Sequence, residues 1–333
     1  MGGDNVVVHT LLPAASQPTS STVTLQIRSK DTVADGVVSL TLTRPDGERL
    51  PDWTPGSHID LVLPDGTVRQ YSLCGDRWDA HRYRIAVLRE SAGRGGSAYV
   101  HDRFTPGDLV GVGGPRNNFP LVPADRYLFI AGGIGITPLV PMIRQAELMG
   151  IDWQLLYGGR TRGSMAFAEE LAQAHGGRVH LAPQDECGLL DLASWLNEPA
   201  SGTKVYCCGP APLLTAVEEA CAAWPPHHLR TERFAAAAQA APVRRAPFEV
   251  ELRRTGATVT VTPDISVLQA VRRAGAEVLS SCEQGTCGTC LTPVLEGTPD
   301  HRDTLLADHE RAANDCMFPC VSRSCDDRLV LDL

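Results

Sequence analysis

Four cysteines near the C-terminal end of the sequence have the spacing of an iron–sulfur site. Cys282, Cys287 and Cys290 form a C-x4-C-x2-C run, and Cys320 lies further along the chain. Four thiolates in this order hold a plant-type [2Fe-2S] cluster. A zinc site would instead favour two separated C-x2-C pairs, and this run contains one such pair. The spacing therefore predicts a cluster that exchanges single electrons.

The loop that carries the first three cysteines can wrap closely around a cluster. Gly285 and Gly288 interrupt it. Glycine lets the backbone turn tightly and direct its N–H groups toward sulfur. Cysteines and glycines interleaved in this way are not expected of ordinary core packing, so the loop itself supports the cluster interpretation.

Two glycine turns in the middle of the chain indicate a nucleotide site. The first, Ala131–Pro138, lies between the strand-like run Tyr127–Ala131 and the apolar helical run Leu139–Met149. The second, Cys207–Pro210, ends another strand-like run, Val205–Cys208. Such turns let the backbone approach a pyrophosphate, although the first lacks the G-x-G-x-x-G fingerprint. Together they predict a dinucleotide in the crevice of an open α/β sheet.

The N-terminal third has the pattern of an antiparallel β-barrel. Residues 22–112 alternate apolar and polar positions in short runs separated by turns. Examples are Val23–Ile27, Val37–Leu42, Ile59–Leu63 and Tyr83–Leu88. Residues 125–232 instead alternate strands with helical stretches, which indicates a parallel α/β sheet.

The barrel segment contains groups suited to a phosphorylated aromatic cofactor. Arg69 offers a fixed cation, Tyr71 an aromatic plane and Ser72 a short hydroxyl. A turn at Gly95-Gly96-Ser97 offers backbone N–H groups to a phosphate. Taken singly, Tyr71 would be interpreted as an ordinary strand residue, so the prediction depends on the combination.

Composition and charge limit the class of protein. The chain has 333 residues, 43% of them hydrophobic, which suits two or three domains. No run is long enough to cross a membrane, and no signal-peptide pattern is present. Eleven cysteines without a regular disulfide framework favour a reducing compartment, so a cytoplasmic protein is expected.

The negative charge is concentrated near the C-terminal end. Residues 247–333 hold 14 Asp and Glu against 8 Arg, a net charge of −6 out of −9 for the whole chain. This disfavours nucleic acid as a partner. An acidic face could steer a basic protein toward the cluster, or it could serve solubility alone.

From about residue 20 to residue 333 the order of these motifs resembles the phthalate dioxygenase reductase family, within the ferredoxin-NADP reductase superfamily. So many motifs in one order make the resemblance specific. The matching segments are Arg69–Leu73, Gly93–Ser97, Gly114–Leu121, Gly132–Pro138, Tyr157–Arg160, Tyr206–Pro210, Glu232–Phe234, Asp300–Asp303 and Cys320–Arg323.

The resemblance implies a multidomain protein with three domains in a fixed order. After a flexible N-terminal tail, 1–20, an FMN-binding antiparallel β-barrel is expected at 21–122. An NAD-binding α/β domain with a parallel sheet is expected at 123–234, followed by a linker at 235–246. A plant-type [2Fe-2S] ferredoxin domain with an α+β (β-grasp) fold is expected at 247–333.

The resemblance also implies roles for individual residues. FMN is expected against Arg69, Gln70, Tyr71, Ser72, Gly95, Gly96 and Ser97. The nicotinamide cofactor is expected against Gly132, Gly133, Gly135, Thr137, Pro138, Arg160, Gly209 and Pro210. The cluster ligands are expected to be Cys282, Cys287, Cys290 and Cys320.

Three further assignments follow from the same resemblance. Cys208 is expected beside the reacting nicotinamide carbon, with Cys207 as packing. Phe234 is expected near the flavin, or alternatively as a linker anchor in a small apolar pocket. The segment Asp300–Asp303 is expected to brace the ferredoxin structure or its interface.

The function implied is an NADH-dependent reductase component of an oxygenase system. NADH gives two electrons as hydride, a cluster accepts one, and a flavin converts between them. The acceptor is expected to be a separate terminal oxygenase of the Rieske non-haem iron type, acting on an aromatic compound by hydroxylation or O-demethylation. A cytochrome P450 is the alternative acceptor, and a monomer is expected.

Four points stay open at the level of the sequence. FAD could replace FMN in a relative of the same domain order. NADPH could replace NADH, because Arg160 and Arg162 follow the second strand of the nucleotide domain, where a 2′-phosphate binds. Cys316 could replace Cys320 as the fourth ligand. A non-catalytic redox sensor would keep the cluster without oxidising a nicotinamide.

Overall fold

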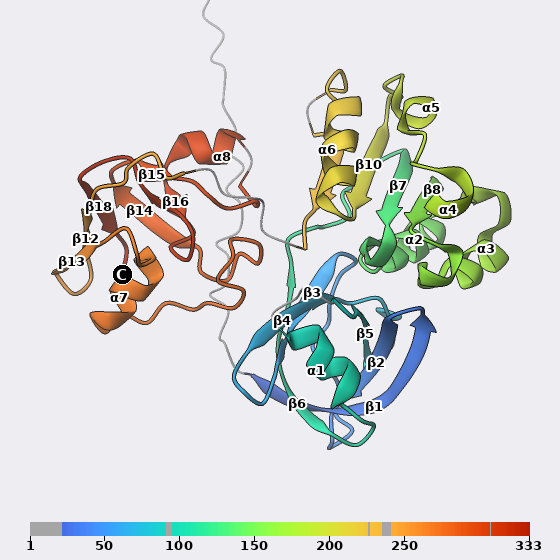
Figure 1. Ribbon diagram of the computed structural model, residues 1–333, viewed down its shortest axis with the longest axis horizontal. Helices are drawn as coiled ribbons and strands as arrows, with labels where there is room; N and C mark the ends of the chain where they lie inside the picture. The colour runs from blue at the N-terminus through green and yellow to red at the C-terminus, as the bar shows by residue number, and fades with distance from the viewer. Residues whose placement is uncertain (1–21, 91–94, 226, 235–240, 307) are drawn as a thin grey trace, which may run out of the picture.

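The computed structural model describes residues 22–90, 95–225, 227–234, 241–306 and 308–333. Three sheets of five or six strands follow one another along the described part of the chain and occupy three parts of the molecule (Figure 1). The predicted tail, 1–20, and residues 235–240 of the predicted linker lie outside the described residues. No helix within the described ranges is long and apolar enough to cross a bilayer.

The first sheet is a six-stranded antiparallel barrel with the order β4-β3-β6-β1-β2-β5. A bridge between Leu73 and Ile85 joins its two edges. Alternate side chains point inward and form a buried core, which helix α1 completes by inserting Val100. The elements are β1 Val23–Ala34, β2 Val37–Thr43, β3 Ser57–Val62, β4 Val68–Ser72, β5 Tyr83–Leu88, α1 Gly96–Asp102 and β6 Leu109–Asn117.

Two elements of the barrel differ from the sequence prediction. Strand β1 continues to Ala34, past the run that the sequence predicts to end at Ile27. The register of its pairing with β2 shifts between Ile27 and Ser29. A bulge of this kind reverses which side chains face inward and breaks the alternation. At Gly96 a helix begins where a turn was expected; Gly95, with φ of +82°, precedes it.

The second sheet is parallel, with the order β11-β10-β7-β8-β9, as predicted. Helices α2 and α3 pack on one face and α5 and α6 on the other. Its strands are β7 Arg126–Gly132, β8 Asp152–Gly159, β9 Val179–Pro183, β10 Thr203–Cys208 and β11 Leu229–Glu232. Its helices are η1 Gly133–Ile136, α2 Leu139–Leu148, η2 Arg162–Ser164, α3 Ala168–His175, η3 Gly176–Arg178, α4 Gln184–Cys187, α5 Leu192–Leu196 and α6 Ala211–Ala220.

The third sheet is mixed, with the order β13-β12-β18-β14-β16, and β15 pairs separately with β17. Helix α7 packs Val267, Ala270 and Val271 against it, which gives the predicted α+β arrangement. Its elements are β12 Phe248–Leu252, β13 Ala257–Val261, α7 Val267–Arg273, β14 Thr292–Glu296, β15 Pro299–Asp300, α8 Asp308–Ala313, β16 Cys316–Met317, β17 Arg323–Ser324 and β18 Arg328–Leu331.

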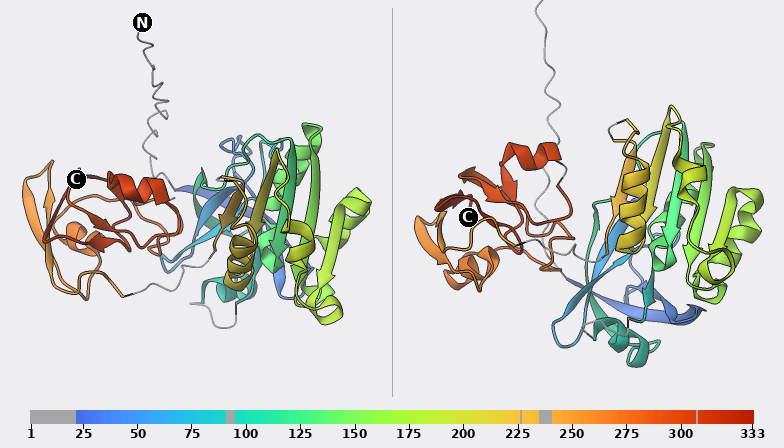
Figure 2. Two further views of the ribbon diagram at one scale, coloured as in Figure 1. Left: turned by 90° about the horizontal axis from the view of Figure 1, so that it is seen from above. Right: turned by 45° about the horizontal axis from the view of Figure 1, so that its top comes forward.

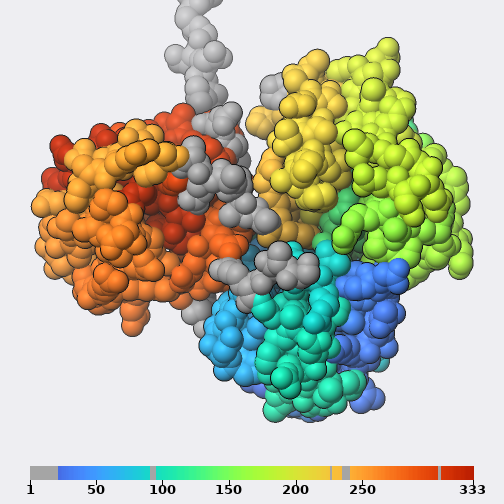
Figure 3. Space-filling model, viewed as in Figure 1, coloured from blue at the N-terminus to red at the C-terminus, as the bar shows by residue number. Residues whose placement is uncertain are grey.

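The loop of cysteines between α7 and β14 meets the barrel. Asn118 Nδ2 donates a hydrogen bond to the Cys287 carbonyl at 2.8 Å, and Ser281 Oγ donates one to Asp60 Oδ1 at 2.7 Å. The C-terminal part (orange and red) accordingly lies against the barrel (blue and cyan) near the centre of the molecule (Figures 2 and 3). The fold therefore brings the cysteine loop to β3 and to the end of β6, and β3 pairs directly with β4, which carries predicted flavin residues.

Candidate functional site

One pocket is lined by residues from all three parts of the chain. From the barrel come Val68, Arg69, Gln70, Tyr71, Ser72, Ala86, Leu88, Glu90, Gly96 and Ser97. The middle part contributes Ile134 and Thr137, with Phe234 shortly after β11, and the cysteine loop contributes Cys282, Gln284 and Thr286. A group held on β4 would therefore lie between the nucleotide turn and the cysteine loop.

Arg69 and the start of α1 form the cationic side of this pocket. A Cβ atom on Gly96 would lie 2.5 Å from Arg69 Nε, so the arginine side chain runs directly across that glycine. Ser97 Oγ accepts a hydrogen bond from the Glu90 N–H at 3.0 Å. A guanidinium beside the first N–H groups of a helix suits a phosphate.

The other side of the pocket suits an aromatic ring with polar edges. Ala86 and Leu88 provide apolar surface, while Ser72 is almost fully buried. Burial raises the pKa of Tyr71 to about 12, so its hydroxyl stays protonated and can donate a hydrogen bond at neutral pH. The residues present thus fit a phosphorylated flavin.

The two predicted glycine turns lie side by side at the carboxyl ends of β7 and β10. Ala131 pairs with Cys208 across these parallel strands. A Cβ atom on Gly135 would overlap the Cys208 carbonyl oxygen, and one on Gly132 would lie 2.7 Å from Pro210 Cδ. The two backbones are therefore too close for any side chain at Gly132 or Gly135.

The remaining residues of the first turn hold its shape. Thr137 is buried, and its hydroxyl donates to the Ile134 carbonyl at 3.0 Å. Pro138 caps α2, and Gly133 has φ of +54°. This bare backbone at the end of two neighbouring parallel strands is where a dinucleotide binds in open α/β sheets.

Cys208 is fully buried and contacts a carboxyl group to which the sequence analysis gave no role. Its Sγ lies 3.9 Å from Glu232 Oε2. Burial raises the pKa of Glu232 to about 8 and that of Cys208 well above its ordinary value. Glu232 as a residue is half-buried, and its carboxyl group lies against the buried Cys208 thiol. Burial therefore favours the neutral form of both groups.

Cys207, one position earlier, packs in the opposite core cluster with α5 and α6, whereas Cys208 faces the cluster with α2. The two side chains alternate because they are neighbours in a strand. Cys208 therefore lies on the α2 side of the sheet, where its thiol contacts Glu232, and Cys207 lies on the opposite side.

The arginines that follow β8 are on the surface. Arg162 pairs with Glu169 at 3.4 Å and with Glu186 at 3.5 Å. Arg160 is exposed at the end of the strand. The charge of Arg162 is thus engaged by carboxylates of this chain.

The four predicted ligand cysteines gather in two pairs. Contact with the Cys287 thiol lowers the pKa of Cys282 to about 5, while the pKa of Cys287 is raised by the same contact. Contact between Cys290 and Cys320 likewise lowers the pKa of Cys320 and raises that of Cys290.

Two pairs of thiols fit a [2Fe-2S] cluster, in which each iron takes two protein ligands. The arrangement therefore fits two irons that share four thiolates.

Cys316, the alternative fourth ligand, has different surroundings. Burial raises the pKa of its thiol to about 11, and its polar neighbour is Asp315 rather than another cysteine. The position of Cys320 beside Cys290 therefore favours Cys320.

The loop backbone around the cysteines is shaped as the sequence indicated. Gly285 has φ of +71°, and a Cβ there would lie 2.7 Å from Val321 Cγ2. The Gln284 N–H lies 3.3 Å from Cys282 Sγ. Hydrogen bonds to cluster sulfurs are one of the ways a protein sets the reduction potential.

The segment Asp300–Asp303 holds backbone in place beside this loop. Asp303 is buried and accepts hydrogen bonds from the N–H groups of Leu305 and Leu306 at 3.0 and 2.9 Å. Asp300 accepts one from the Val243 N–H at 3.1 Å. These contacts support a bracing role.

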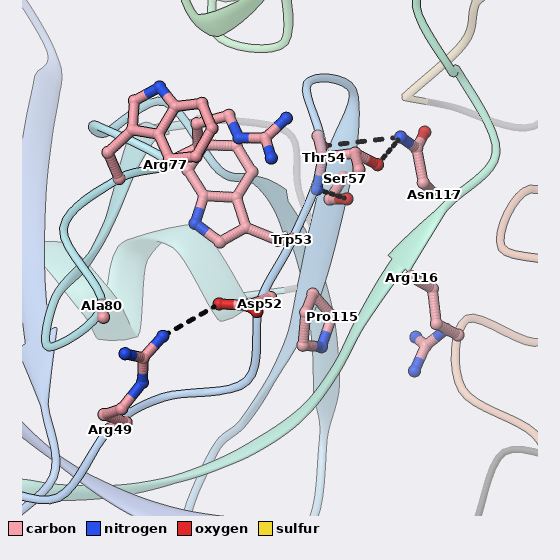
Figure 4. A pocket seen from close by; sticks show the side chains of 11 residues that line it. Arg49, Asp52, Trp53, Thr54, Ser57, Arg77, Ala80, Pro115, Arg116 and Asn117 are labelled. Atoms are coloured by element: carbon pink, nitrogen blue, oxygen red, sulfur yellow. Dashed lines mark hydrogen bonds and ion pairs between the residues drawn. The ribbon is translucent and has the colours of Figure 1, made fainter.

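A second pocket, of about 410 Å³, lies on the barrel (Figure 4). Within it, Asn117 Nδ2 donates to Thr54 Oγ1 at 2.7 Å. It contains none of the residues that the sequence assigns to a cofactor. It is lined by Arg49, Asp52, Trp53, Thr54, Ser57, Arg77, Trp78, Ala80, Pro115, Arg116 and Asn117.

Residues 250–325 match the family model of the 2Fe-2S iron-sulfur cluster binding domain. The chain is also 44% identical over 317 residues to the phenoxybenzoate dioxygenase subunit beta of Ectopseudomonas oleovorans, covering 95% of this chain and 98% of the relative. The match therefore extends through all three parts of the fold.

Solved structures give the same result. A self-sufficient type IV cytochrome P450 monooxygenase matches with a TM-score of 0.88 at 44% identity over 94% of this chain, which spans 41% of that longer protein. Phthalate dioxygenase reductase matches with a TM-score of 0.70 at 38% identity, covering 94% of this chain and 98% of that structure. The chain therefore belongs to the phthalate dioxygenase reductase family of the ferredoxin-NADP reductase superfamily and is an oxidoreductase with flavin, nicotinamide and [2Fe-2S] sites.

Proposed function

We propose that this chain carries electrons from NADH through FMN and its [2Fe-2S] cluster to a separate terminal oxygenase of the Rieske non-haem iron type. The observation that carries the proposal is the shared pocket, because Tyr71, Thr137 and Cys282 all line it. A bound flavin would supply the conversion of a two-electron hydride into single electrons. This chain's residues supply the binding and the close approach of the three sites.

The barrel residues hold and orient the flavin in this proposal. Arg69 and the N–H groups at Gly95, Gly96 and Ser97 bind the phosphate, and Gln70, Tyr71 and Ser72 bound the ring. Phe234 lines the same pocket on the nucleotide side and is 44% exposed. It would cover the flavin until a nicotinamide takes that place.

The nucleotide binds at the paired turns, with Gly132, Gly133, Gly135, Thr137, Pro138, Gly209 and Pro210 against its pyrophosphate and nicotinamide ends. Cys208 and Glu232 then lie at the nicotinamide end. Because burial raises the pKa of Glu232 and favours its protonated form, the carboxyl group can donate a hydrogen bond to the nicotinamide carboxamide. We propose that Arg160, which directly follows β8, also contacts this nucleotide.

The electron acceptor is proposed from the relatives. The phenoxybenzoate dioxygenase relative supports an oxygenase partner that acts on an aromatic compound. Our proposal is that this partner is of the Rieske type and carries out hydroxylation or O-demethylation. The P450 whose reductase part resembles this chain supports a cytochrome P450 as the second candidate. The excess of acidic residues in 247–333 would steer a basic docking face toward the cluster.

The proposal also includes the organisation of the chain. The domains are an FMN barrel at 21–122, an NAD domain at 123–234, a linker at 235–246 and a ferredoxin domain at 247–333, after a tail at 1–20. The protein is proposed to act as a cytoplasmic monomer.

The fourth cluster ligand is testable together with the electron path. Cys320→Ser is expected to remove the cluster absorbance and to lower NADH-driven cytochrome c reduction more than about tenfold. Reduction of ferricyanide, which the flavin alone can support, should stay within about twofold of wild type. Cys316→Ser is the matched control and should leave all three unchanged; the reverse result would make Cys316 the ligand.

The flavin is testable by extraction. Denaturing the purified protein should release FMN at about one molecule per chain, measured by chromatography against FMN and FAD standards. Recovery of FAD would contradict the FMN assignment and would leave the rest of the electron path standing.

The preference for NADH is testable through Arg162. Wild type is expected to show a kcat/KM at least about tenfold higher for NADH than for NADPH. Arg162→Ala should change both values by less than about twofold, because Glu169 and Glu186 already engage this side chain. A loss confined to NADPH would instead show a 2′-phosphate site.

The raised pKa of Glu232 predicts a pH-dependent stability. The folded-state pKa of about 8 exceeds the ordinary value of 4.5, so the native state favours the protonated form. The contribution of Glu232 is therefore fully present below about pH 4.5 and is lost as the pH rises through about 8.

Thermal unfolding should show this as a fall in the Tm of wild type relative to Glu232→Gln between pH 5 and pH 9. Glu219→Gln, an exposed change on α6, is the control and should follow wild type. A constant Tm difference between wild type and Glu232→Gln across this range would show that Glu232 ionises normally.

A further inference from the structure

A single carboxylate joins the strand of predicted flavin residues to the cysteine loop. Asp60 lies on β3, paired in register with Gln70 of β4. Its Oδ1 accepts hydrogen bonds from Gln70 Nε2 at 3.0 Å and from Ser281 Oγ at 2.7 Å. Gln70 lines the shared pocket, and Ser281 directly precedes Cys282. One hydrogen bond therefore links Asp60 to the shared pocket, through Gln70, and another links it to the cysteine loop, through Ser281.

The charge of Asp60 is balanced from a third element. Arg116 of β6 brings Nη2 to 2.6 Å from the same Oδ1 atom. This approach is an ion pair rather than an aligned hydrogen bond, because Nη2 has no hydrogen-bond partner among the described residues. Figure 4 shows the Arg116 side chain beside β6.

Burial shields the contacts of Asp60 from water. Asp60 is 7% exposed, so little water can reach its carboxylate to replace these partners. A buried charge needs its partners, since losing one leaves an uncompensated charge in a low dielectric. The register of β3 against β6 shifts between His58 and Asp60, and such a bulge re-aims a side chain.

Asn118, which directly follows β6, contacts the same loop at a second point. Asn118 Nδ2 donates to the Cys287 carbonyl at 2.8 Å, and a Cβ on Gly288 would lie 3.2 Å from that same nitrogen. Asp60 therefore contacts the loop just before Cys282, and Asn118 contacts it at Cys287. The two contacts fix both ends of the first ligand pair.

We propose that Asp60 is a positioning residue that fixes the cysteine loop against the flavin strand and so sets the rate of electron transfer to the cluster. The inference rests on the proposed order of flavin before cluster. In the step concerned, one electron leaves reduced FMN and reduces one ferric ion of the cluster to ferrous; no bond forms or breaks. Nothing in hydride transfer from NADH requires Asp60.

The test compares Asp60→Asn and Ser281→Ala with wild type in the full chain with its cofactors. After rapid mixing with NADH, absorbance follows flavin reduction first and cluster reduction second. Both variants should slow the second phase by at least about fivefold, because a loop that is no longer held in position lies on average further from the flavin and the rate of electron transfer falls steeply with distance. In Ser281→Ala, which does not touch the flavin strand, the first phase and ferricyanide reduction should stay within about twofold.

Ser280→Ala is the matched control. Ser280 is one residue away, and its hydroxyl contacts Glu283 and Arg272 within its own part of the chain. This variant should keep the wild-type rate of cluster reduction. Ser281→Ala keeps the test valid if Asp60→Asn folds poorly, because it removes only one hydrogen bond.

Hydrogen exchange gives a readout that does not depend on activity. Asp60→Asn and Ser281→Ala should speed exchange both at residues 68–72 and at residues 278–290, because one contact links the two segments. Ser280→Ala should leave residues 68–72 unchanged. If Ser281→Ala only loosened the loop, hydrogen exchange would speed up at residues 278–290 and stay unchanged at residues 68–72.

The outcomes separate this inference from the function it rests on. If wild type reduces its cluster after its flavin, and both variants do so at the wild-type rate, the role of Asp60 is overturned. If the wild-type cluster is not reduced after the flavin at all, the proposed function itself fails.

Discussion

Electron transfer from a nicotinamide to an iron–sulfur cluster requires three binding sites within a short distance of one another, and each site comes from a different sheet. The shared pocket meets this constraint: Tyr71, Thr137 and Cys282 line it from the barrel, the parallel sheet and the cysteine loop. The barrel and the parallel sheet share one buried cluster, in which Val37, Ala86 and Phe119 pack with the core of the parallel sheet. The C-terminal sheet has a separate core, so its position against the barrel depends more on polar contacts. The buried carboxylate of Asp60 is the contact that connects the flavin strand directly to the loop before Cys282.

Close backbone approach is the second requirement, and it explains why glycines recur at the sites. Gly135 packs against the Cys208 carbonyl and Gly285 against Val321, at distances that exclude a side chain. At the nucleotide turns this leaves N–H groups accessible at the ends of two parallel strands. At the cysteine loop it lets the backbone curl around four thiols. The same property of glycine therefore serves a dinucleotide in one sheet and a cluster beside another.

The sequence predicted the features that local spacing encodes. The alternation of Tyr83–Leu88 gave β5 with its observed bounds, because one face of that strand is buried along its whole length. The helix at Gly96 and the extension of β1 were missed, since a left-handed Gly95 and a bulge leave no clear periodic signal. The role of Asp60 was invisible for a different reason: its partner Ser281 lies 221 positions away. Glu232 was noted only as part of a shared motif, because the burial that raises its pKa depends on the assembled sheet.

The most direct test of the central claim is an anaerobic titration of the wild-type protein with NADH, followed by flavin absorbance and by electron paramagnetic resonance of the cluster. A flavin that takes two electrons and a cluster that takes one should together consume about 1.5 equivalents of NADH per chain. Protein stripped of flavin but retaining its cluster should consume none, and re-adding FMN should restore the full uptake. Reduction of the cluster by NADH in flavin-free protein would contradict the proposed path.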